Sequence, residues 1–426
     1  MSGQLASPLL QIPIGNRPEA LDVCQHKEKA ILLLRLHGIP VRLQDSVDDA
    51  VPERCLLLLV FQHQVLQIMK LEQESVWLHR PLIQREESDY ESLTGTETEQ
   101  EINLAKQLAV RSIYALGLDY GMVTIGVYSP ARQKVIDVSP VSEQLRLIQE
   151  ARKEYEEKER IEQAFPNPVI LGADPEFALR NEAGKMAMAS RFFGKSGKVG
   201  CDAVRYREEI YSTHFPIAEL RPAPAAEPGE LFRNLYMTLR LAKQKITDTS
   251  LAWIAGGMPF AGYPIGGHLH FSGVGLTFAL LRKLDTYLTL PLFLLEDAGC
   301  RERRPRYGFL GDFREKAHGG FEYRTLPSWL ISPGITKGVL ALAKVIATHY
   351  RMLRYEFSLE LRVQRAYYLG DKKGIAPLVQ RIWEELAQMP IYRSYRQDLE
   401  PFFSLVMSGE EWLADEDLRI TWKLNR

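Results

Sequence analysis

Residues 168–179 read PVILGADPEFAL, in which apolar and acidic positions alternate as they do along a half-buried β-strand. Residues two apart share a face of a strand, so one face is apolar and the other presents Asp174 and Glu176 side by side. Pro175 favours an extended backbone at Asp174. Adjacent carboxylates are unfavourable without a compensating cation. Two solvated acids at a strand end would give the same pattern, so this segment alone predicts only a strand with an acidic face.

Three further segments repeat this division into an apolar face and a polar face. Each places two charged or imidazole side chains together, and the pairs are Glu219 with Arg221 (217–222), His268 with His270 (266–273) and Glu322 with Arg324 (321–326). A soluble antiparallel sheet often has one solvated face, so a single strand of this kind is ordinary. Four of them in the second half of the chain favour a shared site.

The side chains of these strands predict the kind of metal that such a site would bind. Carboxylate oxygens with an imidazole suit Mg²⁺ or Mn²⁺ better than Zn²⁺, which prefers sulfur and nitrogen ligands. The carboxylates exceed what one ion needs, so two or more divalent ions that hold a polyphosphate would balance them. The candidate ligands are Asp174, Glu176, Asp202, Glu219, Glu322 and one or both of His268 and His270.

Two basic segments are candidates for phosphate binding. Residues 301–316 read RERRPRYGFLGDFREK, with six basic and three acidic side chains, and the arginine fork suits phosphate and carboxylate oxygens. A solvated charged loop would have the same composition. Residues 192–200 read FFGKSGKVG, whose glycines would let the backbone approach a phosphate beside Lys195 or Lys198. A plain hairpin turn is favoured for these letters, because the sequence lacks the GxxxxGK[ST] motif.

The composition indicates a soluble globular protein. The chain has 426 residues, of which 46% are hydrophobic and 25% charged, close to globular averages and long enough for two or three domains. A formal net charge of −1 gives no overall field that attracts nucleic acid or an anionic membrane. The apolar runs are shorter than a membrane span, the first ten residues lack the basic start of a signal peptide, and the four cysteines have no CxxC spacing. We therefore expect a cytoplasmic protein with reduced thiols and no nucleic-acid or membrane partner.

The periodicity along the chain predicts an α+β protein. Between residues 150 and 162 ten of thirteen residues are charged, which is typical of a solvated helix and makes this segment the best domain boundary. Beyond it strands come first and helices dominate after about residue 330, an order that favours α+β over alternating βαβ units. A kink is expected at Pro291. The predicted parts are a tail (1–18), a small α+β domain (19–149), a helical linker (150–165) and a larger domain with a helical C-terminal region (166–426).

Seven short motifs form an ordered set in the second half of the chain. They are GADPEF (172–177), CD (201–202), ELRP (219–222), GGHLHFSG (266–273), RPRYG (304–308), GDFREK (311–316) and FEYRTLPSW (321–329). As a set they resemble the phage-type amidoligases, carboxylate–amine ligases of the glutamine synthetase and glutamate–cysteine ligase superfamily. The resemblance covers about residues 168–390. It implies an antiparallel sheet curved into a funnel, with helices behind it and two or three Mg²⁺ ions that hold ATP.

The resemblance also implies roles for individual residues. The implied metal ligands are Asp174, where better-known relatives have glutamate, together with Glu176, Asp202, Glu219, His268 and Glu322. The implied contacts to ATP phosphates or to a substrate carboxylate are His270, Arg324, Arg304, Arg306, Arg314, Lys316 and Lys198. Among these residues Glu176, Arg306 and Arg324 are the expected catalytic groups.

This set of residues leads us to expect ATP-dependent amide formation. A carboxylate would attack the γ-phosphate to give an acyl phosphate, and an amine would then displace phosphate to give an amide. The substrates would be small-molecule or peptide carboxylates and amines. Two alternatives stay open. One is a metal-dependent amidohydrolase, since HxH also occurs in zinc hydrolases, and the other is a binding or scaffold protein on a ligase fold.

The first half of the chain has a fainter resemblance of its own. ALGLDYGMVTIGV (115–127) and KVIDVSPV (134–141) are similar to the last subdomain of ATP-grasp ligases. Ser139 stands where that pattern, after Asp137, has asparagine, and no upstream lysine strand or glycine loop of the ATP-grasp type is found. The resemblance therefore favours a truncated, non-catalytic remnant that presents substrate or a partner over a working nucleotide site.

Overall fold

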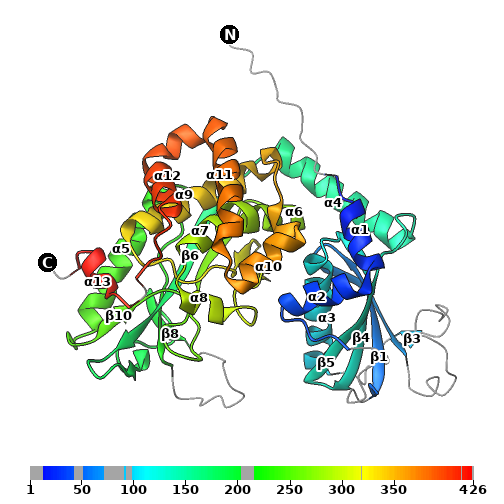
Figure 1. Ribbon diagram of the computed structural model, residues 1–426, viewed down its shortest axis with the longest axis horizontal. Coiled ribbons are helices and arrows are strands. Elements are labelled where there is room, and N and C mark those ends of the chain that lie inside the picture. Colours follow the sequence, from blue (N-terminus) through cyan, green and yellow to red (C-terminus); the bar gives the residue numbers. More distant parts are fainter. Residues whose placement is uncertain are drawn as a thin grey trace, which may run out of the picture. The chain divides into compact units, whose positions relative to one another are not determined.

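The computed structural model describes residues 13–42, 51–71, 91–92, 98–202, 215–317, 319–413 and 415–424. The chain divides into two compact units, Met1–Ala164 and Phe165–Arg426. Most of the predicted tail lies outside the described residues. Both units combine helices with antiparallel sheets (Figure 1), so the α+β prediction is confirmed. Among the described residues, none of the helices has both the length and the apolar character that a bilayer crossing requires.

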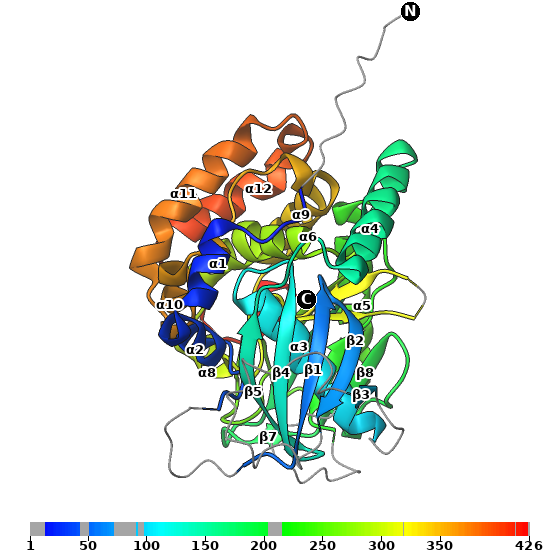
Figure 2. The ribbon, with the colours of Figure 1, turned by 90° about the vertical axis from the view of Figure 1, so that its right-hand side faces the viewer.

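The first unit is built on a five-stranded antiparallel sheet with the order β3-β2-β1-β4-β5. Its elements are α1 (Pro18–Gln25), α2 (Lys27–Leu36), β1 (Arg54–Phe61), β2 (Gln64–Leu71), β3 (Glu91–Ser92), α3 (Glu99–Ala115), β4 (Tyr120–Ser129), β5 (Arg132–Ser139) and α4 (Arg146–Ala164). In Figure 2 the strands lie side by side with α3 packed on the sheet. The charged segment forms the greater part of α4, and just ahead of this segment Ile148 is buried against Leu59, Phe61 and Tyr120.

The second unit contains an eight-stranded sheet in which β6 is the central strand. The main order is β12-β13-β11-β6-β9-β8, and β7 and β10 also pair with β6. Every one of these pairings is antiparallel. The strands are β6 (Ile170–Arg180), β7 (Met186–Ala187), β8 (Val199–Asp202), β9 (Ile217–Leu220), β10 (Ala252–Ile254), β11 (Gly267–Ser272), β12 (Phe313–Glu315) and β13 (Phe321–Tyr323).

Helices cover this sheet and supply most of the apolar core of the second unit (Figure 1). They are α5 (Pro228–Lys245), α6 (Phe278–Leu284), α7 (Leu290–Leu295), α8 (Ala298–Arg303), α9 (Pro333–His349), α10 (Leu361–Leu369), α11 (Lys372–Gln388), α12 (Tyr392–Met407) and α13 (Leu418–Thr421). The sequence predicts a kink at Pro291, and the structure has an irregular helical turn just before this residue. Asp285–Thr289 form a π-helical turn between α6 and α7, in which the Leu290 amide donates to the Asp285 carbonyl. Pro291 has no amide hydrogen with which to continue an α-helical ladder through this turn.

Helices α9 and α12 approach each other closely at Gly338, which leads to a stability prediction. A Cβ atom at Gly338 would lie 2.6 Å from Cδ2 of the buried Phe402 ring. Alanine is normally favoured over glycine inside a helix by about 0.5–1 kcal/mol. We expect Gly338→Ala to lower the free energy of unfolding instead, by about 1–3 kcal/mol, because the core becomes overpacked. Thermal or urea unfolding measures this change.

A matched control lies in the same helix. A Cβ atom at Gly334 would have its nearest neighbours at 3.9 Å, which is ordinary van der Waals contact. Gly334→Ala is therefore expected to leave the free energy of unfolding unchanged or raised. Equal effects of the two substitutions would contradict the close packing of α9 on α12.

Candidate active site

The strand register brings the polar faces predicted from sequence together on one side of the second sheet. On β6, Asp174 lies opposite His268 of β11, and Glu176 lies opposite Glu219 of β9. On β11, His270 lies opposite Glu322 of β13. Side chains of directly paired residues lie on the same face of a sheet. Four strands separated by long stretches of chain therefore contribute to one polar surface.

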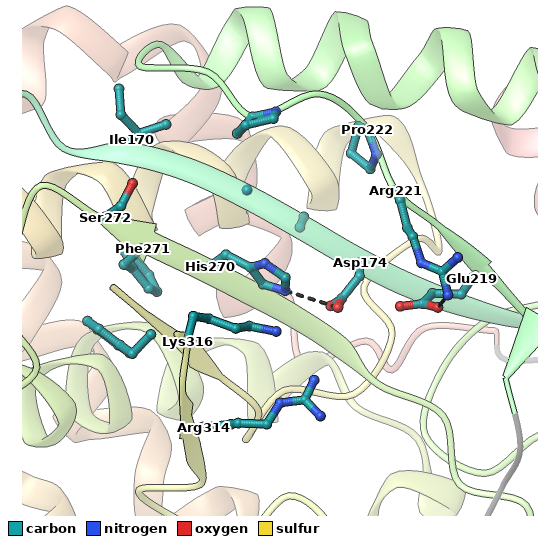
Figure 3. Close-up of a pocket in the computed structure, with 14 residues that line it drawn as sticks. Ile170, Asp174, Glu219, Arg221, Pro222, His270, Phe271, Ser272, Arg314 and Lys316 are labelled. Atoms are coloured by element: carbon teal, nitrogen blue, oxygen red, sulfur yellow. Dashed lines mark hydrogen bonds and ion pairs between the residues drawn. The ribbon is translucent and has the colours of Figure 1, made fainter. Parts of the chain in front are cut away.

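Asp174 and the two histidines form the centre of this surface. Nε2 of His270 lies 3.0 Å from Oδ2 of Asp174, and Nδ1 of His268 lies 3.3 Å from Oδ1 of Asp174. Figure 3 marks the contact between His270 and Asp174 with a dashed line. The same His268 nitrogen lies 3.2 Å from Oε1 of Glu322. Burial lowers the pKa of His268, but the neighbouring Asp174 raises this pKa by more than burial lowers it. The net shift is therefore upward. Nδ1 of His268 thus lies between the two carboxylates.

Several buried polar atoms in this centre are not satisfied by hydrogen bonds. They are Oδ1 of Asp174, Nε2 of His270, Oε1 of Glu322 and Nε of Arg324. Each lies within ion-pair distance of an opposite charge, but none of these contacts has hydrogen-bond geometry. Buried polar groups normally have such partners, so each exception needs an explanation.

The geometry of these atoms fits a divalent cation. One ligand atom each from Asp174, His270 and Glu322 lies within 4.8 Å of the other two. Two carboxylate oxygens and one imidazole nitrogen form a donor set that suits Mn²⁺ or Mg²⁺. This trio contains His270, whereas the family resemblance assigned metal binding to His268.

Three cationic side chains surround Glu322, whose side chain is fully buried. Arg314 of β12 donates to its Oε2 from Nε at 2.9 Å and from a terminal nitrogen at 2.6 Å, and Nζ of Lys316 lies 2.5 Å from the same oxygen. Nε of Arg324 lies 3.3 Å from Oε1. Burial raises the pKa of Glu322, but the neighbouring cations outweigh it and the net shift is downward. Glu322 therefore stays ionised and holds these cations at the edge of the polar surface.

A cavity of about 570 Å³ opens over this surface. Asp174 and His270 lie in its middle, with Arg314 and Lys316 on one side and Glu219 with Arg221 on the other (Figure 3). Its volume falls within the range of about 300–1,000 Å³ that is usual for small-molecule sites. The cavity therefore combines acidic ligands for a cation with basic side chains for an anion.

The carboxylates of Asp174, Glu176 and Glu219 on the polar surface differ in the direction in which their pKa values shift, and of these three Asp174 and Glu219 line the cavity. Burial raises the pKa of Asp174, but the neighbouring imidazoles of His268 and His270 lower it well below its ordinary value. Burial raises the pKa of Glu176 to about 7, although its Oε2 accepts a 2.6 Å hydrogen bond from the Gly266 amide. Burial and the charge of Asp174 raise the pKa of Glu219 to about 7. Near neutral pH one of these acids is ionised and two are poised to ionise when a cation arrives.

Arg221 is a cavity residue that sequence analysis placed on the correct face but did not assign to the site. It pairs with Glu219, and a terminal nitrogen donates to the Lys195 carbonyl at 2.9 Å. The space for its guanidinium exists because residue 200 is glycine, since a Cβ there would lie 2.8 Å from Cζ of Arg221. The shared face with Glu219 and the glycine-rich turn at 194–197 were the available signals.

Other predicted site residues lie away from the trio. Arg304 is buried among the helices, where it pairs with Glu296 at 2.8 Å and stacks on the Tyr367 ring, so the structure does not bring it to the cavity. Arg306 and Lys198 are exposed and are not among the described residues that line the cavity. Asp202 is exposed at the end of β8 and contributes by raising the pKa of Glu176. For Arg306, Lys198 and Asp202 the assigned roles stay predictions.

The family model of the phage phiEco32-like COOH.NH2 ligase-type 2 proteins matches residues 171–424, more than half of the chain. The chain belongs to this ligase family. The amidoligase resemblance of the second unit is thereby confirmed. The matched residues include every strand that contributes to the cavity, whereas the first unit lies outside them.

Two solved structures are distantly similar to this chain. A bifunctional glutathione synthetase from Pasteurella multocida has 11% sequence identity and a TM-score of 0.37, with 60% of this chain and 51% of that chain covered. GmaS without ligand has 12% identity and a TM-score of 0.34, with 66% and 77% covered. The chain thus spans about half the length of the glutathione synthetase. No curated protein matches it in sequence.

The raised pKa values of Glu176 and Glu219 predict how stability depends on pH. Both carboxyls have an ordinary value of 4.5 and a folded value of about 7. Between these values the folded chain holds more protons than the unfolded chain, so the free energy of unfolding falls as pH rises. We expect the melting temperature in EDTA to fall from pH 5 to pH 8, and Mn²⁺ to restore it more at pH 8 than at pH 5. Calorimetric melts measure both effects.

The double variant Glu176→Gln, Glu219→Gln isolates the contribution of these two groups. Its melting temperature should depend less on pH over the same interval, because amides do not titrate. A pH dependence identical to that of the parent protein would show that the two carboxyls do not have the proposed environment.

Proposed function

We propose that this ligase uses ATP and Mg²⁺, or Mn²⁺ in its place, to join a carboxylate to an amine through an acyl phosphate. The observation that carries the proposal is the convergence of Asp174, His270 and Glu322 beside Arg314 and Lys316 at one cavity, in a member of a carboxylate–amine ligase family. A cation site next to an anion site is what a metal-bound polyphosphate requires. Family membership favours this function over a hydrolase or an inactive scaffold.

The residues of the chain divide between the cation and the phosphates. Asp174, His270 and Glu322 would hold one divalent cation, and Glu176 and Glu219 supply further carboxylates for a second. When bound, the cations would supply positive charge that offsets the charge of the triphosphate. We propose that this charge balance explains why so many acids are retained in one cavity.

The basic side chains would act on the transferring phosphoryl group. Burial lowers the pKa of Arg324, but Asp312 and Glu322 raise this pKa by more than burial lowers it. The net shift is upward, so the guanidinium stays charged. A fixed guanidinium in a partly buried site stabilises negative charge that develops on phosphoryl oxygens. Arg314 and Lys316 line the same side of the cavity and would orient the phosphates.

The proposed reaction needs no nucleophile from the protein. The substrate carboxylate oxygen forms a bond to the γ-phosphorus as the bond to the β-phosphate oxygen breaks, which releases ADP. The amine nitrogen then bonds to the acyl carbon as the acyl C–O bond to phosphate breaks, and the amine loses a proton. The products are an amide, ADP and inorganic phosphate.

The remaining parts of the prediction concern substrates and location. We propose small-molecule or peptide carboxylates and amines as substrates, without a nucleic-acid or membrane partner, and the cytoplasm as the place where ATP is supplied. The first unit is proposed to present substrate or a partner, since the family match does not include it.

Amine-dependent ADP release tests the proposed function. We expect Glu176→Gln and His268→Ala to lower this rate by about 100-fold or more, because each removes a group of the cation-binding surface. The measurement is coupled ADP release with Mg-ATP and pooled amino acids or peptides, with mass spectrometry to find a product lighter by one water than its two parents.

Glu182→Gln provides the control, because Glu182 is an exposed acid in the turn after β6. It should keep the parental rate and melting temperature. Unchanged turnover in both site variants would end the assignment of the cavity as the place of reaction.

A further inference from the structure

We propose that Asp285, buried behind the second sheet, is a positioning residue that fixes the cation- and phosphate-binding side of the cavity. It acts through Tyr323 and Gly311 on the strands that carry Glu322 and Arg314. The proposal rests on the proposed function of the cavity. Asp285 lies outside the sequence motifs that surround the site, between those at residues 266–273 and 304–308.

One carboxylate oxygen of Asp285 accepts hydrogen bonds from strand β13 and from the turn that precedes strand β12. The Tyr323 hydroxyl donates to its Oδ1 at 2.6 Å, and the Gly311 amide donates to the same oxygen at 3.1 Å. The Thr289 hydroxyl lies 2.6 Å from the Tyr323 hydroxyl. All three side chains are fully buried. In such surroundings a hydrogen bond to a carboxylate is stronger than in water, and its loss is costly.

Asp285 and Thr289 are four residues apart in the helical segment, a spacing that places both side chains on one face toward the same hydroxyl. Both residues belong to the π-helical turn, which lies between two segments of α-helix made largely of apolar residues. A π-helical turn contains one more residue than an α-helical turn, so the positions that face a given neighbour shift along the helix. Turns of this kind are frequent at functional sites.

The strands held from behind are those that carry charged groups at the front. Tyr323 stands between Glu322 and Arg324 in the chain, and successive side chains of a strand point to opposite faces. Gly311 lies two residues before β12, which carries Arg314, and it adopts a left-handed backbone with φ of 72°. A shift of Tyr323 or Gly311 would therefore move Glu322 and Arg314 with it.

Arg303 of α8 holds the next residues of the same segment. One terminal nitrogen donates to the Thr325 carbonyl at 2.8 Å, and the other donates to the Arg324 carbonyl at 3.3 Å. Its side chain is almost fully buried. The segment that bears Glu322 and Arg324 is thus fixed by buried side chains at Tyr323 and again at its end. A metal ligand supported in this way is pre-organised before any cation binds.

A neighbouring residue supplies a matched control. Thr286 is fully buried in the same π-helical turn, but its hydroxyl bonds to Ser358 at 3.0 Å instead of to the sheet. Thr286→Val removes a buried hydrogen bond from this turn without touching Tyr323 or Gly311. It therefore reports the general effect of damaging the turn on stability.

The experiment compares Tyr323→Phe and Asp285→Asn with Thr286→Val in the full chain. Mn²⁺ binding is titrated by electron paramagnetic resonance, melting temperatures are recorded, and kcat and KM for ATP are taken from amine-dependent ADP release. We expect Tyr323→Phe and Asp285→Asn to weaken Mn²⁺ binding by about 10-fold, as is typical when the support of a metal ligand is lost. Thr286→Val should keep the parental Mn²⁺ affinity even where its melting temperature falls by a similar amount.

The outcomes separate this proposal from the proposed function. Parental Mn²⁺ affinity in both Tyr323→Phe and Asp285→Asn would overturn the positioning role, as would an equal loss in Thr286→Val. Mn²⁺ binding by the parent protein without amine-dependent ADP release would refute the proposed function. In that case a selective loss of Mn²⁺ affinity in Tyr323→Phe would still support the positioning role. If Tyr323→Phe is unfolded by circular dichroism, Asp285→Asn decides the question.

Discussion

Glu322 has no exposed surface, yet Arg314, Lys316, Arg324 and His268 all lie within ion-pair distance of it. The structure of the cavity depends on this buried charge. A carboxylate without contact to water is tolerated only when cations and hydrogen bonds replace its solvation, so the surrounding basic groups are held in place by the acid that they neutralise. On the other side of Asp174, burial raises the pKa values of Glu176 and Glu219 to about 7. The polar surface thus has one side that is balanced within the protein and one side that a bound cation would balance.

The two faces of the second sheet have different tasks. The front carries groups that can bind ligands, whereas the back carries Phe321, Tyr323 and other side chains that pack into the helical layer. Polar contacts are nevertheless present at the back, where Asp285 and Arg303 fix the segment that bears Glu322. Successive side chains of a strand point to opposite faces but share one backbone. Contacts that fix the strand on its buried face therefore also fix the side chains on its cavity face.

Sequence reasoning recovered the cavity because strand periodicity is local and strict. Asp174 and Glu176 alternate with apolar residues, as do His268 and His270, so each pair is predicted to lie on one face of its strand. The register of the sheet then places the two polar faces on the same side. Charge composition was less informative. Arg304 belongs to a basic segment, but its partner Glu296 is contributed by the end of a preceding helix, which no local pattern reveals. The same holds for α4, where a buried Ile148 lies just ahead of a charged run that otherwise indicates a solvated helix. Asp285 was missed because one acid within an apolar helical run carries no periodic signal. The structural role of Asp285 depends on a hydrogen bond from the Tyr323 hydroxyl, which lies 38 residues away in the chain.

Arg221 reaches the turn at residues 194–197 through the carbonyl oxygens of Lys195 and Gly197. Backbone oxygens are present whatever side chain a position carries, so the identity of Lys195 or Ser196 is free to vary while the anchor persists. This exposed turn is therefore a natural place for diversification. Randomised libraries there would alter the surface beside the cavity residue Arg221, while the ion pair between Arg221 and Glu219 stays intact.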